Sequence, residues 1–150
     1  MGHVKLQKLI FLAQRTENID LPVNFLKQAM GPYDPVMMRS IDKQLSVKKW
    51  FQFAPKEKLK YQPLEKVGEH KTDFEKFYGS EKEKISWLIS TFRKVKTGRV
   101  EIIATLFACW EELLQERKEA TENNLITKFF AWSSDNKNSM SRMCRRKFTG

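Results

Sequence analysis

Few side chains in this sequence have the types and spacing that catalysis requires. Glu112 and Glu116 are four residues apart, so on a helix they would share one face and could bind a metal ion or act as acid and base. Arg117 and Lys118 follow directly, and mixed charges of this kind are typical of a solvated helix face with salt bridges. The sequence therefore favours a surface ion-pair network over a catalytic carboxylate pair.

Metal-binding and phosphate-binding signatures are also missing from the sequence. His3 and His70 have no second histidine or cysteine at ligand spacing, and Cys109 and Cys144 form no metal pattern. The glycines stand singly rather than in a Gly-rich loop that could cradle a phosphate. We therefore expect no catalytic residues, no metal, no cofactor and no small-molecule substrate.

The charge balance favours a polyanionic partner. The chain carries 28 Lys and Arg against 18 Asp and Glu, a formal net charge of +10, and nucleic acid is the commonest partner of such proteins. Lysine and glutamate are intermixed over much of the chain, however, which is equally typical of a solvated surface. Residues 137–147 differ because they hold five cations and no acid. Such a tail either binds phosphates or has no fixed structure.

The length suits one domain with its own core. We expect a single helical domain over residues 1–150, divisible into subdomains at 1–66 and 67–132 and a basic tail at 133–150. Two cysteines are too few for a disulfide framework, and Cys109 in its apolar helical run is expected to be a buried free thiol. With no apolar run of membrane-spanning length and no signal-peptide pattern, we expect a cytoplasmic protein without a membrane partner.

The first part of the chain predicts three helices. An apolar stripe indicates a helix over residues 3–15, and its members are Val4, Leu6, Leu9, Ile10 and Ala13. A second helix is expected to begin at Pro22 and end at Gly31, which suits a left-handed cap. Asp34 can cap a third helix with Pro35 in its first turn. The inner face of this helix would hold Met37, Met38, Ile41 and Leu45, and its outer face Arg39, Ser40, Lys43 and Gln44.

In the next two short runs of the sequence, the spacing of apolar residues changes from a helical pattern to a strand pattern. Residues 50–53 are rich in aromatic side chains and residues 59–63 alternate apolar with polar, so we expect a β-hairpin with its loop at 54–58. Three helices followed by a hairpin is the element order of a winged helix. The predicted fold is mainly α, with a winged-helix-like N-terminal half packed on a C-terminal helical bundle.

The second half is predicted to be helical. Ser80 and Glu83 have the spacing of a capping box, residues 97–98 should separate two helices, and Thr121 should cap the last one. The strongest stripe in the chain predicts one buried face made of Ile103, Leu106, Phe107, Trp110, Leu113 and Leu114.

The predicted winged helix offers a DNA-binding surface. Its third helix would lie in the major groove while the hairpin contacts phosphates. The candidate nucleic-acid-binding residues are Arg39, Lys43, Gln44, Lys48, Lys49, Lys56, Lys58 and Lys60. The alternative is that the fold serves only protein contacts and that the hairpin lysines protect strand edges against aggregation.

Two stretches of the sequence resemble known bacterial domains. Residues 2–12, GHVKLQKLIFL, are similar to the start of the Panacea (SocA-like) antitoxin-associated domains, and residues 31–34, GPYD, occupy the place of their Gly-Pro turn. Residues 29–51 more closely resemble the helical extension at the C-terminus of some type I restriction-modification specificity subunits, and residues 100–106 and 130–132 are similar to it as well. The resemblance covers about residues 3–132, and its motifs are structural. Residues 133–150 depart from it, because another amphipathic helix would be expected there.

The resemblance implies a non-catalytic accessory module of a restriction-modification system. Such a module would contact the DNA backbone, dock other restriction-modification subunits or domains, or do both. The alternative that it implies is an antitoxin-like module that neutralises a partner toxin by covering it. Whether the chain is a standalone protein or a domain of a longer one stays open.

Overall fold

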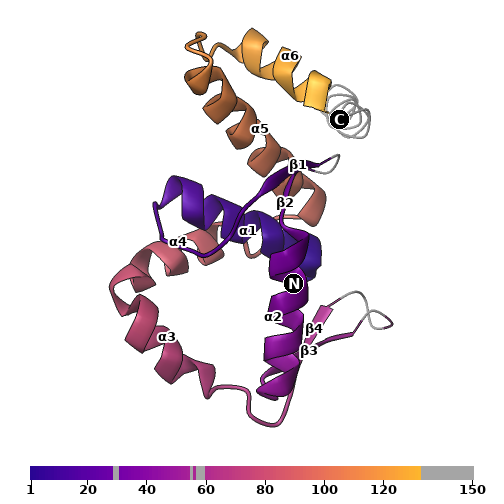
Figure 1. Cartoon of the computed structure of the whole chain (residues 1–150), viewed down its shortest axis with the longest axis vertical. Coiled ribbons are helices and arrows are strands. Elements are labelled where there is room, and N and C mark those ends of the chain that lie inside the picture. Colours follow the sequence, from indigo (N-terminus) through magenta and orange to yellow (C-terminus); the bar gives the residue numbers. More distant parts are fainter. Residues whose placement is uncertain (29–30, 55, 57–59, 133–150) are drawn as a thin grey trace. The chain divides into compact units, whose positions relative to one another are not determined.

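The structure is a computed structural model that describes residues 1–28, 31–54, 56 and 60–132. The described residues are mainly helical with two small β-hairpins, so the prediction of a mainly α fold with a small hairpin is confirmed (Figure 1). In chain order the elements are α1 (His3–Thr16), β1 (Leu26–Gln28), β2 (Gly31–Tyr33), α2 (Pro35–Val47), β3 (Phe51–Ala54), β4 (Lys60–Pro63), α3 (His70–Tyr78), the 3₁₀ helix η1 (Gly79–Glu81), α4 (Lys82–Phe92), α5 (Thr97–Gln115) and α6 (Glu122–Trp132). Within the described part of the chain, no helix combines the length and apolar character needed to cross a membrane.

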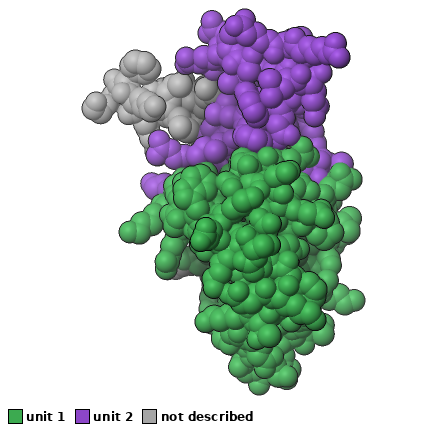
Figure 2. Space-filling model, turned by 90° about the vertical axis from the view of Figure 1, so that its left-hand side faces the viewer, with its two compact units in different colours: residues 1–24, 34–95 green, residues 25–33, 96–150 purple. Residues whose placement is uncertain are grey.

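The chain forms two compact units, each built from two segments. Unit 1 comprises Met1–Asn24 and Asp34–Val95, and unit 2 comprises Phe25–Tyr33 and Lys96–Gly150 (Figure 2). The predicted division between subdomains, at residues 66 and 67, lies inside unit 1.

The second helix that the sequence predicted is not formed, and this prediction was wrong. Its residues instead supply β1, which pairs antiparallel with β2 from Leu26 opposite Tyr33 to Gln28 opposite Gly31. The expected helix was less than three turns long, and helices of that length are marginal without tertiary support. Here the tertiary contact favours the hairpin, because β2 packs on α5 within unit 2. The element order of a winged helix, three helices before the hairpin, is therefore not present.

Polar side chains on α1 occupy much of its buried face. Val4, predicted to be apolar core, is 39% exposed, whereas Lys5, Gln7 and Lys8 are buried with Leu9 and its apolar neighbours. Lys5 Nζ donates hydrogen bonds to the carbonyls of Arg93 and Val95, at 3.0 and 2.6 Å. These carbonyls follow the last turn of α4, where helices leave acceptors unsatisfied and where a cation is favourable.

Asp34 caps α2 as predicted. Its Oδ1 accepts hydrogen bonds from the backbone N–H groups of Val36 and Met37, each at 3.0 Å, and its Oδ2 accepts one from Asn24 at 2.9 Å. The side chain of Gln7 bonds both the carbonyl and the N–H of Asp34, at 2.9 and 3.2 Å. Burial alone would raise the pKa of Asp34, but the three N–H donors outweigh it and hold the pKa below its ordinary value.

Unit 2 consists of α5 and α6 with the β1–β2 hairpin. Ile102, Cys109 and Phe129 form its buried centre, and Cys109 is a free thiol as predicted. The predicted buried face of α5 is partly wrong, because Trp110 is 39% and Leu114 49% exposed. The helix buries a different set, namely Val100, Ile102, Ala104, Thr105, Cys109 and Leu113.

The two predicted caps of the second half differ in outcome. Thr121 caps α6, since its Oγ1 accepts a hydrogen bond from the backbone N–H of Asn124 at 3.2 Å. The capping box of Ser80 and Glu83 is not formed, because Ser80 lies within η1 and α4 begins without a side-chain cap.

Candidate nucleic-acid interface

The outer face of α2 points to solvent as predicted. Arg39, Lys43 and Gln44 are all exposed, and Gln44 Nε2 donates a hydrogen bond to Ser40 Oγ at 3.1 Å. Arg39 and Lys43 are four residues apart, so they extend from the same side of the helix. Neither forms an ion pair with any residue that the structure describes.

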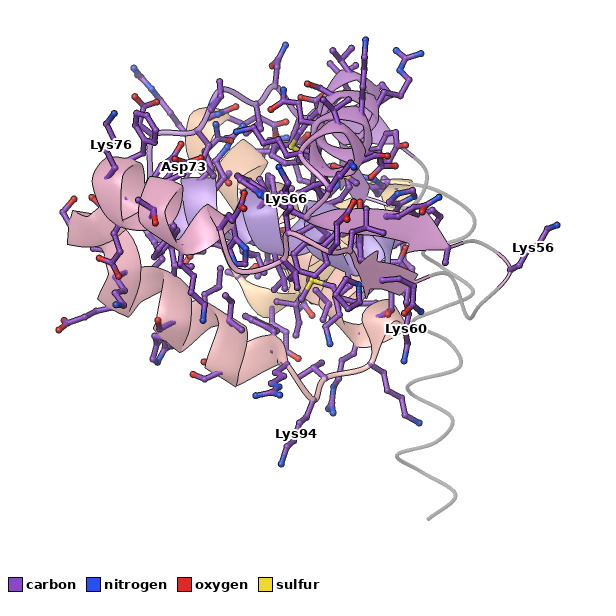
Figure 3. The ribbon with its side chains drawn as sticks, turned by 90° about the horizontal axis from the view of Figure 1, so that it is seen from below. Lys56, Lys60, Lys66, Asp73, Lys76 and Lys94 are labelled. Atoms are coloured by element: carbon purple, nitrogen blue, oxygen red, sulfur yellow. The ribbon has the colours of Figure 1, made fainter. Side chains whose placement is uncertain are left out.

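The hairpin of β3 and β4 carries the second group of predicted cations. Its strands pair in antiparallel register from Phe51 opposite Pro63 to Ala54 opposite Lys60. Lys60 and Lys56 are exposed, and Lys56 projects from the far end of the hairpin (Figure 3). Like the α2 cations, they form no ion pair within the described part of the chain. Lys58 lies outside the described residues, as does the basic tail at 133–150.

Lys48 and Lys49, which join α2 to β3, are engaged in surface ion pairs. Lys48 Nζ lies 3.6 Å from Asp73 Oδ2 and 4.5 Å from the centre of the Trp50 ring. Lys49 Nζ lies 2.9 Å from Glu65 Oε1. All four charged side chains are at least half exposed, and ion pairs of this kind contribute about 1 kcal/mol or less. A phosphate can therefore replace these carboxylates as the partner of Lys48 and Lys49 at little cost in free energy.

A cluster that sequence reasoning missed fixes the hairpin to α2. The His3 ring stacks on Phe53 with centroids 3.6 Å apart, and Tyr61 Oη donates a hydrogen bond to Asp42 Oδ1. His3 Nε2 lies 2.7 Å from Asp42 Oδ2, although the ring nitrogen is not oriented for a hydrogen bond. Burial and the bond to Asp42 raise the pKa of Tyr61. Because Asp42 lies on α2 beside Lys43, this cluster sets the position of the hairpin cations against those of α2.

A pocket was also missed by the sequence analysis. It lies at the C-terminal end of α2 in unit 1 and measures about 340 Å³. Its lining residues are Val47, Lys48, Lys49, Trp50, Lys66 and Glu69. The only signal in the sequence was the run of two lysines before a tryptophan, and nothing there placed Lys66 beside it.

The carboxylates considered for catalysis belong to an ion-pair network in unit 2, as the sequence indicated. Lys128 Nζ lies 3.2 Å from Glu112 Oε2 and 2.7 Å from Glu116 Oε1, and Lys118 lies 2.8 Å from Glu116. Hydrogen bonds from Lys118 and Lys128 lower the pKa of Glu116 to about 2. Lys27 of β1 also lies 3.6 Å from Glu112. In the described ranges, no group of three or more His, Cys, Asp and Glu side chains could hold a metal ion.

No protein-family profile, curated protein or solved structure matches this chain. The residues and their geometry are therefore the basis of the function proposed next.

Proposed function

We propose that the chain is a non-catalytic accessory module that binds the DNA backbone through the exposed cations of α2 and the β3–β4 hairpin. The observation that carries the proposal is the set Arg39, Lys43, Lys56 and Lys60. All four are exposed and none is neutralised by a described carboxylate. Cations that neutralise phosphates release counterions, which provides affinity without reading sequence.

Backbone contact is better supported than base readout. In a helix-turn-helix protein, the preceding helix holds the recognition helix in the major groove. Here the residues immediately before α2 form the β1–β2 hairpin of unit 2. Arg39 and Gln44 have side chains suited to base edges, but their partners in this fold are best taken to be phosphates.

The biological setting of the proposal comes from the resemblance of residues 2–12 and 29–51. We place the module in the cytoplasm, in a type I restriction-modification system, with other subunits or domains of that system as its protein partners. Catalysis and target-sequence recognition would then belong to those other subunits.

A second candidate function, an antitoxin-like module that covers a partner toxin, is favoured by a different surface. Trp110 and Leu114 lie one turn apart on α5 and are 39% and 49% exposed, with Phe107 in ring contact with Trp110 at 5.4 Å. Exposed apolar side chains on one helix face are typical of protein docking.

The test is equilibrium binding of the full chain to a short DNA duplex over a range of salt concentrations. Affinity should fall as salt rises, and the double variant Lys56→Glu and Lys60→Glu should weaken binding equally for unrelated sequences. The slope of log affinity against log salt should decrease by about 2. Lys76→Glu on α3 is the matched control, because Lys76 is exposed in the same unit but lies on the other side of the view in Figure 3.

Two results would contradict the DNA-binding proposal. One is the absence of binding even at low salt, which would leave the protein-docking function as the better candidate. The other is an equal loss of binding free energy per reversed charge in Lys76→Glu and in the hairpin variant, which would mean that net charge rather than the hairpin surface governs binding.

A further inference from the structure

We propose that the pocket at the end of α2 binds an unpaired nucleotide of the nucleic acid, with its phosphate held by lysines and its base stacked on Trp50. The choice of ligand rests on the proposed DNA-binding function. The pocket is an open hollow, and its volume of about 340 Å³ is at the lower end of the range typical of small-ligand sites. It is also continuous with the candidate interface, because Lys48 and Lys49 belong to both.

Backbone hydrogen bonds join the two segments that line the pocket, residues 47–50 and 66–69. After α2 the chain turns at Lys49, which has a left-handed φ of 59°, and the N–H of Trp50 returns to the carbonyl of Leu45 at 3.0 Å. The N–H groups of Leu64 and Lys66 then donate to the carbonyls of Trp50 and Lys49, each at 2.9 Å. These bonds continue beyond the β3–β4 ladder and place the backbone of Lys66 beside that of Lys49.

Three ammonium groups are available to a phosphate at this pocket. Lys66 is exposed and forms no ion pair with a described residue. Figure 3 shows it, in that view, between Asp73 on α3 and the hairpin lysine Lys60. Lys48 and Lys49 are paired with exposed carboxylates, and because such pairs contribute little free energy, both ammonium groups can bind a phosphate instead.

Trp50 supplies the aromatic surface for a base. Its ring is half-buried, with the His70 ring at 5.8 Å and the Lys48 ammonium at 4.5 Å. Stacking of a nucleic-acid base on an aromatic side chain is stronger than a cation–π contact at an exposed site, so a base can displace Lys48 from the ring. The exposed Glu69 carboxylate can accept a hydrogen bond from an N–H group of the base.

The ligand must be unpaired because the bases of a duplex are stacked on one another. A blunt duplex presents phosphates to the lysines along its whole length, but it exposes a base face only at its two terminal pairs. A single-stranded overhang presents both.

The experiment compares a blunt duplex with the same duplex carrying a 3′ oligothymidine overhang, at low salt. The intact protein should bind the overhang duplex about tenfold more tightly, and Trp50→Leu should lose this preference while its affinity for the blunt duplex stays unchanged. Trp87→Leu is the matched control, because Trp87 lies in the same unit, is 57% exposed and does not line the pocket. Equal affinity of the intact protein for both duplexes, or an unchanged preference in Trp50→Leu, would overturn the proposal.

A spectroscopic measurement keeps the proposal testable if Trp50→Leu does not fold. The chain has four tryptophans, and the indole N–H signal missing from Trp50→Phe identifies Trp50 in a nitrogen–proton correlation spectrum. This signal should shift on addition of the overhang duplex. A similar shift with thymidine monophosphate would assign the pocket to free nucleotides as well. No shift with either probe, or the same shift with inorganic phosphate alone, would overturn base stacking.

The two proposals fail in different ways. If the blunt duplex binds but Trp50 does not respond to unpaired nucleotides, the pocket proposal is wrong and the DNA-binding proposal stands. If no duplex binds but thymidine monophosphate shifts the Trp50 signal, the DNA-binding proposal is wrong and the nucleotide pocket stands.

Discussion

Replacing Asp34 by alanine should destabilise unit 1 more than any exposed acid-to-alanine change. The substitution removes an N-cap, which costs about 1 kcal/mol. It also removes the acceptor for the Asn24 N–H, a bond to a charged group that contributes about 1.5 kcal/mol. Asp34 is only 7% exposed, so solvent screens these interactions little. We expect the free energy of unfolding to fall by about 2–3 kcal/mol.

The assay is urea unfolding followed by tryptophan fluorescence. A background of Trp110→Phe and Trp132→Phe leaves Trp50 and Trp87 as the reporters, and both lie in unit 1. Asp73→Ala is the control, because this exposed acid makes one surface ion pair and should cost less than about 0.5 kcal/mol. A loss below about 0.5 kcal/mol for Asp34→Ala, or one equal to that of Asp73→Ala, would refute the reasoning.

We also expect the stability lost in Asp34→Ala to depend on pH. Because the folded pKa of Asp34 lies below its ordinary value, the ionised carboxylate stabilises the folded state at pH values above the unfolded pKa of about 3.9. That contribution is lost as pH falls through the lowered folded pKa. The difference in unfolding free energy between the intact protein and Asp34→Ala should therefore be constant near neutral pH and shrink below about pH 4. If this difference in unfolding free energy grew on acidification, the proposed role of the ionised Asp34 carboxylate would be wrong.

Three further predictions concern buried polar groups. Gln7→Leu leaves the N–H and carbonyl of Asp34 without their side-chain partner, so the same unfolding assay should show a loss of about 2–4 kcal/mol, and a loss under about 1 kcal/mol would contradict this. Lys5→Met keeps most of the side-chain length but removes two hydrogen bonds from the end of α4, so amide hydrogen exchange there should accelerate. Unchanged exchange would count against the cap. Burial and Glu112 raise the pKa of Cys109 to about 11, so little of the reactive thiolate is present at pH 8. In a Cys144→Ser background, alkylation of Cys109 in the folded protein at pH 8 should be about 200-fold slower than in urea. Equal rates in the two conditions would show that the thiol is exposed.

Some local features of the fold could be predicted because their signals lie within a few residues. Asp34 followed by Pro35 specifies the start of α2 through short-range hydrogen bonds, and Thr121 does the same for α6. The outer face of α2 follows from the same helix period, so the exposure of Arg39 and Lys43 was predictable. The pocket was not, because Lys66 reaches Lys49 only through backbone pairing after the hairpin.

The β1–β2 hairpin and the buried surface of α5 were not predictable, because each depends on packing against another element and not on one apolar stripe. The β1–β2 hairpin replaces a helix because β2 packs on α5. For the same reason α5 must bury more than one face, against α6 and against β2. Trp110 and Leu114 belong to the apolar stripe with the most regular helical spacing in the sequence, and they are left partly exposed as a result.

The buried polar face of α1 has a physical cause that also limits how the net charge should be interpreted. The chain passes between the units after Asn24, before Asp34 and after Val95. Within unit 1, the Asp34 carboxylate and Lys5 satisfy the backbone groups at these points, and Gln7 fixes Asp34. Helix ends and chain crossings need such donors and acceptors, whereas apolar side chains could not supply them. Lys5 and Lys8 are 8% and 1% exposed, so these two charges of the +10 total are not available to a polyanion. The salt dependence of the proposed DNA binding should therefore respond to the exposed cations of α2 and the hairpin.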